Sequence, residues 1–100
     1  ERRLWAEAFM YRLHPQIARV LAVIASGEIG APVHIRTHFG FNAGFNETSR
    51  LYDLALGGGG ILDVGGYPVS LARLIAGAAE GRAFADPVTV KGCGLLAPTG

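Results

Sequence analysis

The sequence predicts an α+β fold, in which helices pack on one face of a sheet. Apolar residues recur with the period of a helix over residues 15–26, and they alternate with the period of a strand over residues 31–42. A second helix and a second strand are expected to follow in the same order. With 100 residues, of which 50% are hydrophobic and 17% charged, the chain is at most one packed domain and is not disordered.

The first half opens with residues 4–13, which mix aromatic and apolar side chains without a breaker. This stretch is either a short buried strand or the first turns of a helix, because periodicity does not separate the two. A clearer pattern follows, with a proline suited to a first helical turn and a glycine suited to the position after the end. The sequence therefore predicts a helix at about residues 15–26, with its apolar stripe at Ile17, Val20, Leu21 and Ile24.

Residues 31–42 alternate apolar and polar side chains, with Val33, Ile35, Thr37, Phe39 and Phe41 on one side. This pattern is typical of a half-buried strand that offers one face to water or a ligand. Residues 42–50 are expected to form a loop, and residues 51–56 fit no element.

The second half contains a glycine run at residues 57–60 and then an apolar stretch. It predicts a helix that includes residues 69–75 and ends near Gly77. Pro68 lies close to its start, so either Tyr67 lies in the first turn or Gly65 and Gly66 absorb a kink. Residues 88–96 are predicted to be a strand, and since two strands alone form a marginal sheet, further strands are expected from outside this chain.

Charge and composition exclude several classes of protein. The net charge is +1 and the basic residues are scattered, which argues against a nucleic acid or an anionic membrane as the partner. The apolar runs are too short to span a bilayer, and the single cysteine, Cys93, excludes an internal disulfide. The start at Glu1 and the turn signal at the C-terminal end indicate a fragment of a longer protein.

The glycine run has three interpretations. A phosphate-binding loop would require Lys-Ser or Lys-Thr after the last glycine, but Ile61 and Leu62 follow. A dinucleotide fingerprint would require a preceding strand and an acid about 20 residues later. Glu80 stands at that distance, although no strand is seen to carry it. A flexible turn that leads into a helix is the favoured interpretation.

Asp63 and Tyr67 are four residues apart, a spacing that places both on one face of a helix. They are equally well interpreted as a catalytic pair or as a capping carboxylate beside a half-buried tyrosine. A tyrosine exchanges a proton near neutral pH only with a cation close by. Arg12 and Arg50 are candidates for that cation, whereas Lys91 lies in the predicted final strand.

No metal site is predicted. The three histidines lie at positions 14, 34 and 38, and no cysteine or acid completes a ligand set around them. Cys93 is expected to be structural. The aromatic residues Trp5, Phe9, Tyr11 and Phe39 are expected to contribute to the core.

Four motifs taken together resemble the glucose–fructose oxidoreductase/inositol dehydrogenase/MocA family. They are residues 7–16, residues 27–30, Arg50 ahead of the glycine run, and residues 63–69 with Ala72 and Arg73. The tyrosine followed by a proline is most similar to the branch of dihydrodiol dehydrogenases and NADP-dependent xylose dehydrogenases.

The resemblance implies an N-terminal Rossmann domain followed by a C-terminal domain with an open, mostly antiparallel sheet. Residues 1–13 would hold the last Rossmann strand, at Trp5 to Leu13. Residues 14–100 would begin the C-terminal substrate and oligomerisation domain, with helices on one face of its sheet. A homo-oligomer through the sheet face and a cytoplasmic location are also expected.

The chemistry that the resemblance implies is hydride transfer between NADP or NAD and a hydroxyl carbon of a sugar, polyol or cyclic diol. Tyr67 would be the acid/base, and Asp63 would orient the substrate or tune the tyrosine. The remaining site residues would be Arg12 and His14 towards the cofactor, and Arg50, Phe41 and Asn42 towards the substrate.

Two family elements are absent from the sequence: the glycine-rich nucleotide fingerprint and the Glu-Lys-Pro tripeptide whose lysine pairs with the tyrosine. The 100 residues alone are therefore expected to be inactive. Two rivals remain: a non-catalytic sugar-sensing or oligomerisation domain of the same fold, and a glycosidase that uses bound NAD transiently.

Overall fold

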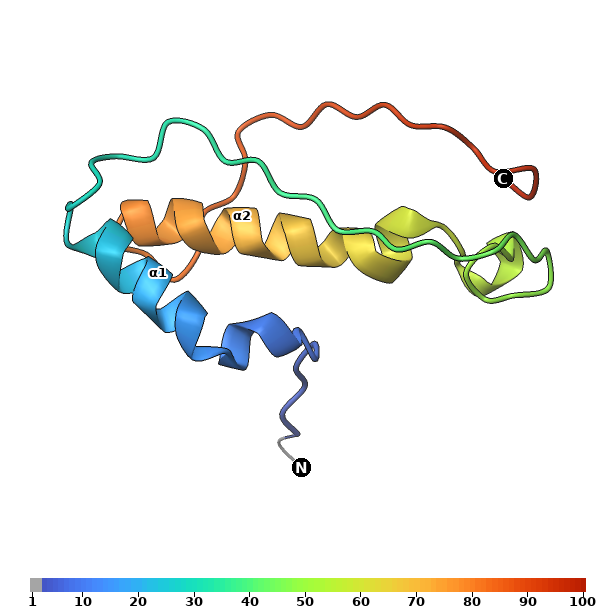
Figure 1. The fold of residues 1–100 in the computed structure, drawn as a ribbon, viewed down its shortest axis with the longest axis horizontal. Helices are drawn as coiled ribbons and strands as arrows, with labels where there is room; N and C mark the ends of the chain where they lie inside the picture. The colour runs from blue at the N-terminus through green and yellow to red at the C-terminus, as the bar shows by residue number, and fades with distance from the viewer. Residues whose placement is uncertain (1–2) are drawn as a thin grey trace.

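A computed structural model describes residues 3–100 of the chain (Figure 1). Two helices, α1 (Pro15–Ala25) and α2 (Gly66–Ala79), form its centre. Three short turns accompany them: η1 (Met10–Leu13) and η2 (Leu54–Leu56), which are 3-10 turns, and η3 (Ile61–Gly65), a π turn that runs directly into α2. The radius of gyration is 16.6 Å, whereas a compact domain of this length has about 13 Å. The fold is therefore open.

The predicted α+β architecture with an open antiparallel sheet is wrong, because residues 3–100 contain no strand. Residues 31–42 are drawn as an irregular trace that passes over α2 (Figure 1). Their backbone makes no hydrogen bond within the described chain. Two side chains join them to α2: the hydroxyl of Thr37 lies 3.3 Å from the carbonyl of Pro68, and the ring of Phe39 packs against that of Tyr67. A strand requires a ladder partner as well as an alternating pattern. Residues 88–96 likewise have no ladder partner among residues 3–100.

The strand expected at Trp5 to Leu13 is also absent from the described residues. Residues 3–9 are irregular, and η1 occupies Met10–Leu13. The division of the chain into domains at residues 13 and 14 remains a prediction.

The first helix is confirmed. Pro15 opens α1, and the ring nitrogen Nδ1 of His14 accepts from the amide of Gln16, 3.2 Å away, as an N-terminal cap does. Gly27 follows the helix with φ of 72°, a left-handed conformation that glycine adopts without strain. Ile24, on the predicted apolar stripe, is buried.

Residues 46–59 were predicted to be loop or were given no element. They fold into a compact series of turns beyond the N-terminal end of α2 (Figure 1). The carbonyl of Ser49 accepts from the amides of Tyr52 and Asp53, and the Asp53 carboxylate caps η2 by accepting from the amide of Ala55 at 2.8 Å. Phe45 packs edge-on against Tyr52, with 5.0 Å between ring centroids. These bonds give the loop a defined shape.

The start of α2 follows the first of the two predicted solutions for Pro68, since Gly65 and Gly66 both have ordinary right-handed helical backbone angles. Tyr67 does lie in the first turn of α2, and the chain before it widens into the π turn that ends at Gly65. A proline within a helix donates no hydrogen bond, and its ring crowds the carbonyl four residues earlier, here that of Val64. A π turn widens a helix locally, which gives such a proline ring room, and π turns are frequent at functional sites.

The end of α2 differs from the prediction, because the helix continues to Ala79 and Gly77 lies within it. Gly77 is buried against Phe84, and a Cβ atom built at Gly77 would lie 2.3 Å from the Phe84 Cα atom. The glycine is therefore required for close approach of two backbones and does not mark the helix end.

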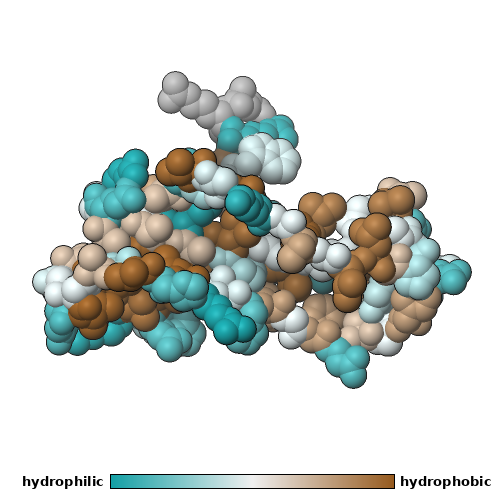
Figure 2. Space-filling model, turned by 90° about the horizontal axis from the view of Figure 1, so that it is seen from above, coloured by the Kyte–Doolittle hydropathy of each residue, from teal (hydrophilic) through white to brown (hydrophobic). Residues whose placement is uncertain are grey.

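Little of the chain is buried. Among the described residues, only Ile24 and Ala85 are buried apolar side chains, and Ser70 is the one buried polar side chain. Apolar side chains gather on the surface over both halves of the molecule (Figure 2). In the described part of the chain, neither helix has the length and apolar character that crossing a bilayer requires.

Candidate active site

Tyr67 lies at the centre of an aromatic cluster that is assembled from three parts of the chain. Its ring meets Phe9 and Phe39 edge-on, with centroid distances of 4.9 and 5.1 Å. The ring of Tyr11 lies 6.4 Å away. Edge-to-face contacts at these distances are favourable and hold the central ring in one orientation. Of the aromatic residues that the sequence assigned to the core, Phe9, Tyr11 and Phe39 thus surround Tyr67, whereas Trp5 is 88% exposed.

A pocket of about 290 Å³ opens beside this ring. Its walls come from η1, from the segment that passes over α2, and from the first turns of α2. The lining residues are Met10, Tyr11, Thr37, His38, Phe39, Tyr67, Pro68 and Leu71. The walls are mostly apolar, so they offer a bound polar group few hydrogen-bonding partners.

The hydroxyl of Tyr67 is free within the described chain, and this separates it from the other two tyrosines. The hydroxyl of Tyr11 bonds Ser70 at 2.8 Å, and that of Tyr52 donates to the carbonyl of Ala43 at 2.9 Å. No described residue pairs with the hydroxyl of the half-buried Tyr67. Its hydroxyl is therefore available to a ligand.

One helical turn beyond Tyr67, Ser70 joins α2 to η1. Besides Tyr11, its Oγ atom contacts the guanidinium of Arg12, which donates from Nη2 at 3.0 Å. Ser70 is only 7% exposed. Ser70 was not predicted as a site residue from the sequence. The one sequence feature that could have indicated it is its position three residues after Tyr67, on the same helix face.

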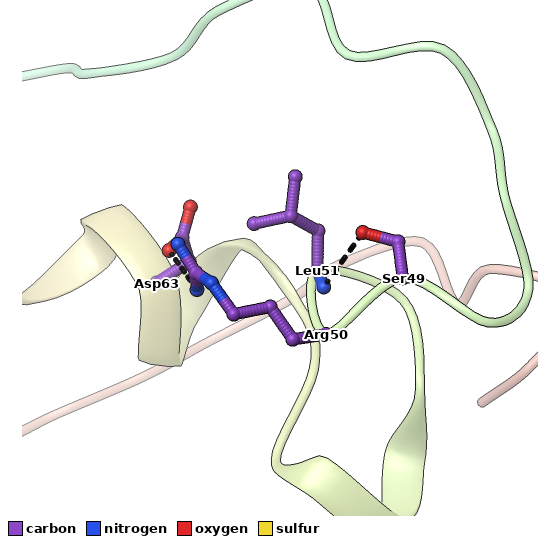
Figure 3. Close-up of polar contacts among 4 residues, drawn as sticks. All are labelled: Ser49, Arg50, Leu51 and Asp63. Carbon is purple, nitrogen blue, oxygen red and sulfur yellow. Dashed lines mark hydrogen bonds and ion pairs between the residues drawn. The ribbon is translucent and has the colours of Figure 1, made fainter.

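Asp63 is paired with Arg50. The guanidinium donates from Nη1 to Oδ1 of Asp63 at 2.9 Å, and Figure 3 shows the arginine reaching from the loop towards the π turn. Ser49 shapes the loop beside it, because its hydroxyl accepts from the amide of Leu51 at 3.3 Å. The side chain of Asp63 is 19% exposed and that of Arg50 72% exposed, so the pair lies at the surface with its acid end sheltered.

Asp63 and Tyr67 line different pockets. The smaller pocket, about 120 Å³, lies beside Asp63 and is shared with Phe41. Its other walls are Ala43, Leu51, Tyr52, Gly59 and Gly60. The predicted pair therefore flanks the start of α2, with the carboxylate bound to an arginine and the phenol in the larger pocket.

The glycine run is a tight turn. The amides of Gly57, Gly58 and Gly59 donate to the carbonyls of Leu54, Asp53 and Leu51 at 2.8–3.1 Å. A phosphate cradle requires such amides to be free for the ligand. The run therefore does not present a cradle, as the favoured interpretation of the sequence expected.

The remaining predicted residues lie at the surface. Arg12 is held by Ser70, and His14 caps α1 through the ring nitrogen described above. Asn42 is exposed, next to Phe41 of the smaller pocket. Among residues 3–100, no three His, Cys, Asp or Glu side chains come together as a metal site would need.

Comparison with known proteins assigns the chain to a family. The family model described as the GFO/IDH/MocA C-terminal domain matches residues 17–92. The chain belongs to this family. The resemblance predicted from its motifs is therefore confirmed.

Two curated relatives of the GFO/IDH/MocA chain are similar over most of its length. A protein of Haloferax volcanii named D-xylose 1-dehydrogenase (NADP(+)) 2 is 39% identical over 89 residues, which cover 89% of this chain and 27% of the relative. A Rhizobium meliloti protein named uncharacterized oxidoreductase ORF334 is 38% identical over 86 residues, covering 82% of this chain and 25% of the relative. The chain thus spans about a quarter of the length of these relatives. No solved structure matches it significantly.

Proposed function

We propose that this GFO/IDH/MocA chain is part of an oxidoreductase that transfers a hydride between NADP or NAD and a hydroxyl carbon of a sugar, with Tyr67 as the acid/base. Membership of the family and the names of the two relatives support an oxidoreductase, and the name of the Haloferax relative supports a sugar as its substrate. The chain matches about a quarter of each relative. We therefore propose the activity for a longer polypeptide that contains it.

The observation that carries the proposal is the free hydroxyl of Tyr67 at an apolar pocket. A general acid/base needs a position within hydrogen-bond reach of the proton that it moves. A phenol already bonded within the protein has to break that bond first. Tyr67 avoids this cost, whereas Tyr11 and Tyr52 do not.

The proposed proton transfer runs between the substrate hydroxyl and the phenolic oxygen of Tyr67. In oxidation the Tyr67 phenolate takes the hydroxyl proton as the carbon–hydrogen bond breaks, so that no full alkoxide charge develops. In reduction the phenol returns the proton to the carbonyl oxygen. The edge-on rings of Phe9 and Phe39 keep the phenol aimed during both steps.

The described residues do not by themselves form a dinucleotide site. The amides of Gly57, Gly58 and Gly59 are already bonded. The guanidinium of Arg12, one of the two predicted cofactor residues, is held by Ser70 of α2. A bound nicotinamide supplies the hydride acceptor or donor. We propose that other parts of the polypeptide hold it, and NADP is favoured over NAD by the name of the Haloferax relative alone.

Arg50, Asp63, Phe41 and Asn42 are proposed to bind the substrate. Asp63 accepts one hydrogen bond from Arg50 at one carboxylate oxygen, and its second oxygen can accept from a sugar hydroxyl. The largely exposed guanidinium keeps donors for further hydroxyls. Phe41 offers an apolar wall in the same small pocket.

The test is Tyr67→Phe in the full-length protein, assayed with D-xylose and other free sugars for net NADPH formation. We expect turnover to fall by about 100-fold or more, while cofactor affinity and folding stay unchanged. Unchanged turnover would exclude Tyr67 as the acid/base.

Two further outcomes would favour the rivals. Sugar binding without hydride transfer in the wild-type protein would indicate a sensing or oligomerisation domain. Hydrolysis of a glycoside without net NADPH formation would indicate the glycosidase.

A further inference from the structure

We propose that Ser70 is a positioning residue that fixes η1 against α2 and thereby sets the wall of the Tyr67 pocket. The consequence for turnover rests on the function proposed above. The structural part of the proposal rests only on the contacts of Ser70.

Ser70 is the one buried polar side chain among the described residues, and two side chains from a distant segment converge on it. Tyr11 and Arg12 are 59 and 58 residues away in sequence, and both lie within 3.0 Å of the Ser70 Oγ atom. Oγ accepts from the guanidinium, and its own proton and second lone pair remain for the phenol of Tyr11. A single oxygen thus ties two consecutive residues of η1 to α2.

Apolar burial contributes little to holding η1 in place. No residue of Met10–Leu13 is buried, and Met10 and Leu13 are mostly exposed. Burial of apolar side chains is the usual source of such docking. The two hydrogen bonds to Ser70 therefore supplement the ring contacts of Phe9 and Tyr11 with Tyr67 in attaching η1 to α2.

The attachment matters because η1 forms one side of the Tyr67 pocket. Met10 and Tyr11 line that pocket, and Phe9, which precedes η1, touches the Tyr67 ring edge-on. Ser70 and Tyr67 lie three residues apart in α2, so the same helix face carries both the anchor and the phenol. If the anchor is lost, the aromatic contacts that orient Tyr67 loosen.

The experiment compares Ser70→Ala, Tyr11→Phe and the double variant in the full-length protein. Ser26→Ala is the matched control, because the Ser26 hydroxyl also makes a hydrogen bond, but to the nearby carbonyl of Val23. Ser26 lies at the end of α1, away from the Tyr67 pocket. The first measurement is amide hydrogen exchange at Arg12 and His14, whose backbone amides donate to the carbonyls of Phe9 and Tyr11. The second is steady-state kinetics, with kcat corrected for the folded fraction and KM determined alongside.

Ser70→Ala is expected to raise the exchange rate at these two amides and to lower kcat, each by about tenfold. KM should change less, and exchange in α1 should be unaffected. Tyr11→Phe should give a smaller change of the same kind, and the double variant should be little worse than Ser70→Ala, because both remove one cluster. Tyr11→Phe removes a single oxygen and keeps the test available if Ser70→Ala fails to fold.

Unchanged exchange at Arg12 and His14 in Ser70→Ala would overturn the anchoring. Faster exchange with unchanged kcat per folded molecule would overturn the positioning role. If the wild-type protein transfers no hydride, the proposed function fails, and the exchange result alone then decides whether Ser70 anchors η1.

Discussion

Arg50 bonds Asp63 across the entrance to α2, with 2.9 Å between Nη1 and Oδ1. The carboxylate that the sequence paired with Tyr67 is thus joined to a loop arginine 13 residues earlier in the chain. The two residues form a polar edge to the smaller pocket, and Tyr67 serves the larger one. In the function proposed above, the smaller pocket would bind the substrate and the larger pocket would hold the proton-transfer group.

Removing Arg50 tests this division. Because exposed ion pairs contribute at most about 1 kcal/mol, Arg50→Ala should leave the free energy of unfolding nearly unchanged. It should raise KM for the sugar several-fold with a smaller change in kcat. Arg82→Ala is the control, since Arg82 forms another surface ion pair, with Glu80 at the other end of α2. A large fall in kcat with constant KM would contradict a binding role for Arg50.

The tyrosines should differ in what their hydroxyls contribute to stability. Tyr52→Phe removes a bond to the carbonyl of Ala43 and should lower the free energy of unfolding by about 1 kcal/mol. Tyr67→Phe removes a hydroxyl without a partner in the described chain, so its effect on unfolding should be close to zero. Urea denaturation of both variants measures the difference. Equal losses would indicate that the Tyr67 hydroxyl has an internal partner.

Pro68→Ala should make the start of α2 more stable and the enzyme slower. The new amide can donate to the carbonyl of Val64, which allows the π turn to relax into α-helix. Relaxation rotates Tyr67 away from Phe9 and Phe39. We expect a small rise in Tm together with a fall in kcat. Pro98→Ala, near the end of the chain, is the control and should leave kcat unchanged. A parallel fall in both quantities would mean that Pro68 serves stability only.

Gly77→Ala should destabilise the protein by about 1–3 kcal/mol, the usual range for overpacking. The added methyl would stand 2.3 Å from the Phe84 Cα atom, so one backbone has to move. Gly92→Ala is the matched control, because nothing lies within 4 Å of a Cβ atom at that position. Thermal unfolding of the two variants gives the comparison, and a neutral Gly77→Ala would show that α2 and Phe84 separate easily.

The parts of the fold that depend on neighbouring residues could be predicted from the sequence. The helix at 15–26 follows from its period and its flanking proline and glycine, and α1 occupies Pro15–Ala25. Alternation over residues 31–42 held only in part, since Ile35, Thr37 and Phe39 line pockets beside α2. Val33, on the same predicted side, is 98% exposed. The same pattern did not reveal that the segment lacks a ladder partner.

The parts that depend on distant residues could not be predicted in this way. Asp63 and Tyr67 were identified from their spacing, but the link from Asp63 to Arg50 requires a loop whose turns were not assigned. Ser70 was missed because its partners are about 60 residues away. A serine within an apolar helix carries no local signal of such partners.

The aromatic cluster around Tyr67 has a consequence for how quickly the protein becomes active. Its ring contacts join position 67 to positions 9 and 39, which are 58 and 28 residues away along the chain. Contacts over such separations form late, because the entropy of closing long loops opposes them until other structure is in place. α1, whose backbone hydrogen bonds join residues close in sequence, can form first. During refolding, recovery of activity should therefore follow the slowest phase of folding, after most of the helical signal has returned.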